Sequence, residues 1–147
     1  MAKIKLEKIE IGNIIPYENN PRRNDKAVQA VANSLQEFGY INPIIVNEDM
    51  VVLAGHTRLK AMKDLGVESV EVVVVSGLTE EEERAFRIAD NRTHEISDWD
   101  DALLVSEMKE AGGVNWAELG FATKDLNKLE PPEQCTCPKC GAKFYWK

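Results

Sequence analysis

Cysteine is nearly absent from this chain: none occurs before Cys135, and all three lie between residues 135 and 140. Such clustering argues against a disulfide framework in a reducing compartment. Long hydrophobic runs are absent as well, because no apolar stretch approaches the roughly 20 residues of a membrane helix. Residues 1–12 alternate charged and aliphatic side chains and lack the apolar core of a signal peptide. We therefore expect a cytoplasmic protein without a membrane partner.

Positive charge is also scarce overall, since the formal net charge is −7. Most of the acidity lies in residues 64–134, which hold six Lys or Arg and eighteen Asp or Glu. An acidic protein is a poor general DNA binder, because non-specific binding depends on neutralising phosphates. Any contact with nucleic acid is then local or made through a partner. One internal cluster of basic residues suits an anion: Arg22, Arg23, Lys26, Arg58, Lys60 and Lys63.

The length of 147 residues, with 44% hydrophobic side chains, predicts one domain with a small appendage. Turn and proline signals divide the chain into a core at 1–95, a helical extension at 96–130 and a linker with a tail at 131–147. Pro131 and Pro132 mark the second boundary.

Hydrophobic periodicity predicts a small mixed α/β (α+β) sheet with packed helices. The expected strands are 4–6, 44–46, 51–54 and 70–75, and a turn is expected at Gly12–Asn13, after the first strand. The expected helices are 25–38, 57–65, 79–91 and 99–111. Asn24 or Asp25 suits the cap of the first helix, Thr79 with Glu82 forms a capping box for the third, and Ser97 or Asp98 opens the fourth.

The most informative stretch is 51–65, where an apolar strand reaches Gly55 and a helical pattern follows at once. The free N–H groups of such a turn and the helix dipole form an anion site. Thr57 adds a hydroxyl, and the Arg58 guanidinium suits phosphate. The alternative is an ordinary strand–helix turn with a solvated arginine. The loop at 18–25, with Arg22 and Arg23, either faces the same anion or is a solvated loop that leads into a helix.

The tail contains Cys137-Pro-Lys-Cys140, which has the spacing of half a zinc knuckle. Cys135 supplies a third thiol. The fourth ligand stays open among His56, His94, water and a thiolate from a second chain, and a decayed ribbon with reactive thiols is the alternative to a Zn²⁺ site.

The order of the segments NNPRR, FGYINPIIV, VVLAGHTRLKAM and IADNR resembles the N-terminal domain of the ParB family, whose fold is shared with sulfiredoxin. The resemblance covers about residues 4–95. The next segments are similar to the ParB-like domain that precedes phage and prophage DNA methyltransferases, which extends the match to about residue 130.

The resemblance implies a nucleoside triphosphate with Mg²⁺, which is CTP in the partition proteins, while ATP stays open here. Asn20, Pro21, Arg22 and Arg23 match the first family box, and Gly55 to Ala61, with Arg58, match the second. Asp90, Asn91 and Arg92 match the third, whose acidic residue and asparagine help to hold Mg²⁺.

The sequence departs from its family at three points. His56 and Thr57 replace a Glu-Arg pair, which leaves the choice of nucleotide and its hydrolysis open. Sulfiredoxins have a nucleophilic cysteine at the place of His56, so sulfinic-acid reductase activity is not expected. The cysteine tail stands where partition proteins continue into a helix-turn-helix.

Two functions follow. The first is a nucleotide-binding regulatory or adaptor module, of phage or prophage type, which meets DNA through a partner such as a DNA methyltransferase. The second is a small phosphoryl-transfer enzyme, an NTPase or kinase, in which His56 is catalytic. A nuclease lacks the dense carboxylate cluster of a two-metal site. A homodimer stays open.

Overall fold

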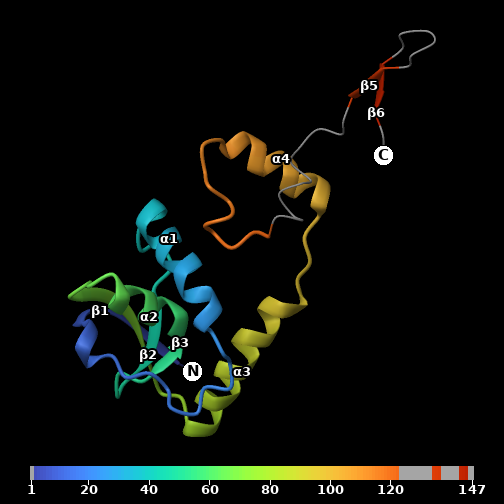
Figure 1. Cartoon of the computed structure of the whole chain (residues 1–147). Coiled ribbons are helices and arrows are strands. Elements are labelled where there is room, and N and C mark those ends of the chain that lie inside the picture. Colours follow the sequence, from blue (N-terminus) through green and yellow to red (C-terminus); the bar gives the residue numbers. More distant parts are fainter. Residues whose placement is uncertain (1, 123–133, 137–142, 146–147) are drawn as a thin grey trace. The chain divides into compact units, whose positions relative to one another are not determined.

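The computed structural model describes residues 2–122, 134–136 and 143–145 (Figure 1). It divides into two units, Met1–Asp98 and Trp99–Lys147. The first unit holds the sheet, and the second begins with a helix. The predicted boundaries at residues 95 and 130 both remain predictions. The prolines that mark the second boundary, Pro131 and Pro132, lie outside the described residues.

A mixed sheet with the strand order β1-β4-β2-β3 forms the first unit, which confirms the predicted fold class. β1 runs antiparallel to β4, β4 runs parallel to β2, and β2 runs antiparallel to β3. The strands are β1 (Lys3–Glu10), β2 (Ile44–Asn47), β3 (Val52–Ala54) and β4 (Ser69–Ser76). β1 is longer than the predicted 4–6, because it pairs with β4 over its full length and needs no clean hydrophobic alternation of its own.

The helices of the first unit are α1 (Val28–Phe38), α2 (His56–Asp64) and α3 (Glu80–Ile96). The capping box of Thr79 and Glu82 is confirmed. The predicted cap at Asn24 or Asp25 is wrong, because a 3-10 turn (Asp25–Ala27) leads into α1 and neither end carries a side-chain cap bond. α3 continues past the expected end at residue 91, since its last turn is stabilised by side-chain bonds from Thr93 and His94 to the Asp90 carbonyl.

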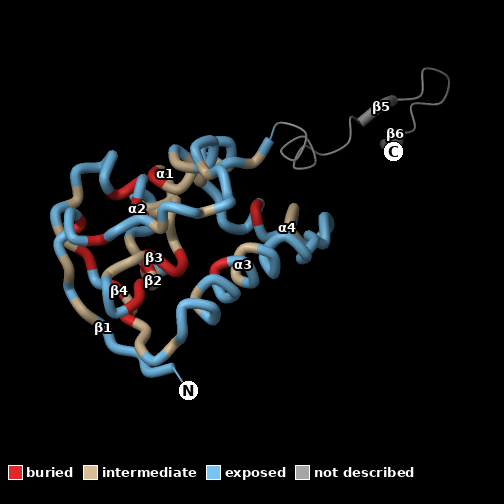
Figure 2. Tube along the Cα trace, turned by 90° about the horizontal axis from the view of Figure 1, so that it is seen from below, coloured by how far each residue is buried: buried red, intermediate tan, exposed pale blue. Residues whose placement is uncertain are grey.

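The hydrophobic core lies on one face of the sheet, where α1 packs on α2 and α2 packs on the strands (Figure 2). β3 is the last strand in the order, yet its three residues are buried. Its free edge is covered: Ile15 forms a parallel bridge with Val51, and the Arg87 Nε donates to the Val52 carbonyl at 3.0 Å. The core members are Ile11, Ile14, Ile44, Val46, Val52, Leu59, Met62, Val70, Val72 and Val74.

The second unit contains α4 (Asp101–Ala111) and a short pair of antiparallel strands, β5 (Gln134–Thr136) and β6 (Lys143–Tyr145). Asp100 caps α4 by accepting from the Leu103 N–H at 3.0 Å, so neither Ser97 nor Asp98 has that role.

The predicted zinc ligands Cys137 and Cys140 lie outside the described residues, as does the side chain of Cys135. Among the residues that the structure does describe, none of the helices is long and apolar enough to span a membrane.

Candidate functional site: a basic cleft at the start of α2

The predicted strand–glycine–helix corner is formed by β3, Gly55 and α2. Gly55 is the N-cap of α2 and has φ +102°, a left-handed conformation that favours glycine. A Cβ on this residue would lie 3.2 Å from two guanidinium nitrogens of Arg58 and 3.3 Å from the Ile44 Cα. No side chain of the described residues caps the helix. The N–H groups of its first turn therefore remain available to an anion, with the helix dipole behind them.

Arg58 is the third residue of α2, within its first turn, and is held beside Gly55. Its Nη1 donates to the Asn42 carbonyl at 2.9 Å, which fixes the direction of the guanidinium and leaves other N–H groups unused. Burial lowers the pKa of Arg58, whereas Tyr40 and Asp90 act in the opposite direction. Within the described residues Arg58 makes no ion pair. A partly desolvated cation without a counter-ion favours an anionic ligand.

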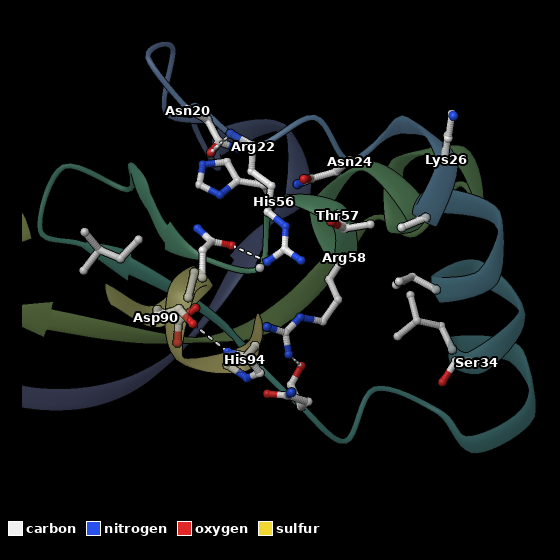
Figure 3. A pocket seen from close by; sticks show the side chains of 18 of the residues that line it. Asn20, Arg22, Asn24, Lys26, Ser34, His56, Thr57, Arg58, Asp90 and His94 are labelled. Carbon is white, nitrogen blue, oxygen red and sulfur yellow. Dashed lines mark hydrogen bonds between the residues drawn. The ribbon is translucent and has the colours of Figure 1, made fainter. Parts of the chain in front are cut away.

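The corner opens into a cleft of about 670 Å³, a volume typical of small-ligand sites (Figure 3). Its walls come from the loop at 20–24, from α1, from the corner and from α3. Four cationic side chains line it, Arg22, Arg23, Lys26 and Arg58, against one carboxylate, Asp90. The other lining residues from the predicted boxes are Asn20, Gly55, His56, Thr57 and Asn91.

A direct hydrogen bond joins the first and third predicted boxes, which lie 69 residues apart. Arg22 Nη1 donates to Asn91 Oδ1 at 2.7 Å, and Asn91 Nδ2 donates to the Arg87 carbonyl at 2.7 Å. Asn20 Oδ1 accepts from the Arg22 N–H at 3.2 Å and shapes the loop. Arg22 is thus held over the cleft by α3.

Asp90 and Asn91, the predicted Mg²⁺ ligands, both line the cleft. Asn91 already accepts from Arg22, so the Asp90 carboxylate is the oxygen donor best placed for a cation. The described residues contain no group of three metal-binding side chains. One carboxylate fits a Mg²⁺ that arrives with phosphate oxygens and water rather than one held by a protein cage.

His56, the predicted catalytic residue, is the first residue of α2. Burial, together with the charges of Arg87 and Lys60, lowers its pKa to about 4. Its Nε2 accepts from the Tyr17 N–H at 3.4 Å, which assigns the proton of the neutral ring to Nδ1. At neutral pH the ring therefore supplies a hydrogen-bond donor and no charge.

Two predicted residues are not among those that line the cleft. Pro21 lies in the loop between Asn20 and Arg22. Arg92 is exposed on α3 and its Nη1 pairs with Glu95 Oε2 at 3.1 Å.

Several cleft residues are not part of the site predicted from the sequence, and three of them are polar or charged side chains with a visible signal or role: Lys26, His94 and Asn24. Lys26 belongs to the basic cluster seen in the sequence, and membership of that cluster indicates the same site. His94 lies one turn beyond Asp90, where helical spacing indicates the same face. Asn24 was treated as a cap. Its Oδ1 is buried and has no hydrogen-bond partner among the described residues, so a ligand N–H or O–H would satisfy it.

A buried polar network behind the cleft was also not foreseen. The Arg87 side chain is 5% exposed, pairs with Glu83 Oε2 at 3.1 Å and lies 4.0 Å from the Tyr17 ring centre. Asn47 Nδ2 donates to both Glu83 carboxylate oxygens at 3.0 and 3.1 Å. The network ties α3 to the β2–β3 turn and to the segment that leads into the 20–24 loop.

The fold and the cleft together define an α/β domain with a basic cleft at the start of α2. The model of the ParB N-terminal domain matches residues 1–92, and the chain belongs to this family. The chain is 34% identical over 83 residues to the ParB-like nuclease domain-containing protein YnaK of Escherichia coli K12, covering 95% of that protein and 56% of this chain.

Other similar proteins are longer. The chain is 36% identical over 126 residues to a probable chromosome-partitioning protein ParB of Campylobacter jejuni, covering 82% of this chain but 39% of that protein. Among solved structures, the C-terminally truncated ParB of Caulobacter crescentus complexed with CTP-γ-S has a TM-score of 0.60 at 19% identity, covering 85% of this chain and 70% of the other. A pNOB8-like ParB N-domain has a TM-score of 0.53 at 20% identity, covering 99% of this chain and 55% of the other. Both likenesses concern the fold.

Proposed function

We propose that this chain binds a nucleoside triphosphate with its phosphates at the start of α2. The carrying observation is the cleft itself, in which an uncapped helix N-terminus, a left-handed glycine and four cationic side chains face one carboxylate. The proposal is supported by the CTP-γ-S complex of the similarly folded Caulobacter ParB. CTP is the first candidate for this reason, and ATP is the second.

Each side chain has a role that follows from its position. The N–H groups after Gly55 and the Arg58 guanidinium bind phosphate oxygens, and Arg22 and Arg23 close over them from the loop. Asp90 holds the Mg²⁺ that accompanies the phosphates. On α1 and just after it, the cleft is lined by apolar side chains that suit the base: Val31, Leu35, Phe38 and Ile41. Asn24 accepts a hydrogen bond from the sugar or base.

Calorimetric titration of CTP, ATP and GTP with Mg²⁺ tests this assignment. Charge-assisted hydrogen bonds are worth roughly 1.5–3 kcal/mol. Arg58→Ala should therefore weaken binding about tenfold to a hundredfold, and Arg58→Lys should recover part of the loss. Lys63→Ala is the matched control, because Lys63 is on the same helix and outside the cleft. Equal affinities for wild type and Arg58→Ala would reject the phosphate site.

Whether nucleotide is turned over depends on His56. Its neutral ring and its bond to Tyr17 favour an orienting role. We therefore expect His56→Ala to keep nucleotide binding within a few fold. Release of inorganic phosphate by wild type, abolished in His56→Ala, would instead support the alternative of a small phosphoryl-transfer enzyme.

We further propose that the nucleotide-bound domain acts as a regulatory or adaptor module in DNA partition or modification, in a phage or prophage setting. The name of the Campylobacter relative, a probable chromosome-partitioning protein, supports a link to DNA partition. The acidic net charge favours contact with DNA through a partner, for which a DNA methyltransferase is our candidate. Mobility-shift titrations should show no tight DNA complex with the chain alone. A salt-resistant complex without any partner would contradict the adaptor role.

A further inference from the structure

The outer edge of β1 is the longest open strand edge in the described part of the chain. β1 pairs with β4 on one side, and no described strand pairs with its other side (Figure 1). Two large aliphatic side chains of β1 are exposed, Ile4 at 72% and Leu6 at 65%. An open edge with exposed aliphatic residues is a template for pairing with another strand.

The register of β1 determines which backbone groups point to the open side. The ladder with β4 continues to Ile11, whose N–H donates to the Glu68 carbonyl at 2.9 Å. Bonded and non-bonded pairs alternate in an antiparallel ladder. The odd-numbered residues of β1 therefore bond to β4. Residues 4, 6, 8 and 10 direct their N–H and C=O groups outward, where they form a continuous row of donors and acceptors.

Within one chain, Lys5 Nζ already pairs with Glu7 Oε1 at 2.6 Å. In one antiparallel register, a second β1 adds lysine–glutamate pairs between the chains, which gives a cluster of four alternating charges. If Leu6 lies opposite the partner's Leu6, then Lys5 lies opposite the partner's Glu7 on both sides of the two-fold axis. Leu6 is then a hydrogen-bonded pair, as its outward N–H and C=O require, and the lysine–glutamate pairs are the closer, non-bonded pairs. Moving the axis to Lys5 or to Glu7 would instead place like charges opposite each other.

We infer that β1 is a docking edge for a second copy of this chain, paired antiparallel about a two-fold axis at Leu6. Two sheets then join into one. The two Leu6 side chains lie on the sheet face that carries Ile4 and the partly buried Val73 and Val75, so the apolar strip continues from one copy into the other. The lysines of β1 exclude unrelated strands that lack an acid at the matching position.

A charge exchange between two variants tests the register. Lys5→Glu places two acidic side chains opposite each other, at position 5 and at the partner's Glu7, and Glu7→Lys places two basic side chains opposite each other, at position 7 and at the partner's Lys5. Each variant alone should lose dimer formation by about tenfold or more. An equimolar mixture should restore it as a heterodimer, because each acidic side chain then meets a basic one. Sedimentation velocity over a concentration series, on untagged full-length chains, measures all three samples against the 16.5 kDa monomer.

The control is Lys63→Glu, which has the same change in charge on α2, away from β1, and should dimerise like wild type. Thermal melting of every variant shows that the monomer is folded. A wild type that stays monomeric at every concentration would overturn the inference. A dimer that neither variant weakens, or a mixture that associates no better than its components, would also overturn it.

Discussion

At the scale of single residues, the proposed phosphate corner depends on glycine at position 55. Alanine at a φ of +102° is strained by roughly 1–2 kcal/mol. Its Cβ would also press on the Arg58 guanidinium at 3.2 Å. We expect Gly55→Ala to lower the free energy of unfolding by that amount and to weaken nucleotide binding at least tenfold, measured by urea denaturation and calorimetry.

Gly12→Ala is the control for that substitution, because nothing lies within 4 Å of its added Cβ. It should leave both quantities nearly unchanged. A Gly55→Ala variant with wild-type affinity would show that close backbone approach is not needed.

His56 predicts a pH dependence of stability. Its pKa is about 4 in the folded protein and near 6.5 when unfolded. The unfolded state binds the proton more readily, so the contribution of His56 is complete above pH 6.5 and is lost as the pH falls toward 4. When the pH is lowered from 7.5 to 5, the melting temperature of wild type should fall by more than the melting temperature of His56→Gln. The carboxylates common to both proteins cancel in the difference, and parallel melting curves would contradict the prediction.

At the scale of elements, Arg87 connects α3 to the edge of the sheet. Arg87→Met keeps much of the side-chain volume but removes the cationic partner of Glu83, whose side chain is 15% exposed and keeps its hydrogen bonds from Asn47. Breaking a buried pair costs about 3–5 kcal/mol, and we expect the lower end of that range because Glu83 is only partly buried. Arg84→Met, which loses only an exposed pair with Glu80 on the same helix, should cost less than about 1 kcal/mol. Urea denaturation compares them.

The double variant Arg87→Met with Glu83→Gln separates charge from packing in this comparison. It should recover part of the loss, because no partly buried carboxylate is then left without its cationic partner. No recovery would assign the cost to packing of Arg87 against Tyr17.

Local signals predicted the elements that depend on neighbouring residues. The strand before Gly55, the helix after it and the capping box at Thr79 each follow from a short stretch of sequence. The full length of β1 was not predicted, because the residues of β4 that pair with it lie 59 to 73 positions further along the chain. The Arg22–Asn91 bond and the Arg87–Val52 bond were missed for the same reason. The resemblance to a family predicted which three segments form the site, but only the structure showed which of their side chains line the cleft.

At the scale of the whole molecule, all core members lie between Ile11 and Val74. A fragment of residues 1–98 should therefore fold with a melting temperature close to that of the full chain and with the same nucleotide affinity. If Cys135, Cys137 and Cys140 bind zinc, the full chain purified under thiol protection should carry about one Zn²⁺ per chain or dimer, and the fragment none. Metal analysis and circular dichroism check both expectations. A full chain without zinc would remove the metal site.

The two ends of the sheet differ in a way that limits assembly. At β3, the Ile15 bridge and the Arg87 guanidinium occupy the edge, while no strand of the described residues pairs with the outer edge of β1. A four-stranded sheet with one open edge can join only one neighbour through it. Pairing through β1 therefore closes at two copies and does not propagate this sheet into a fibre, in contrast to a sheet that is open at both edges.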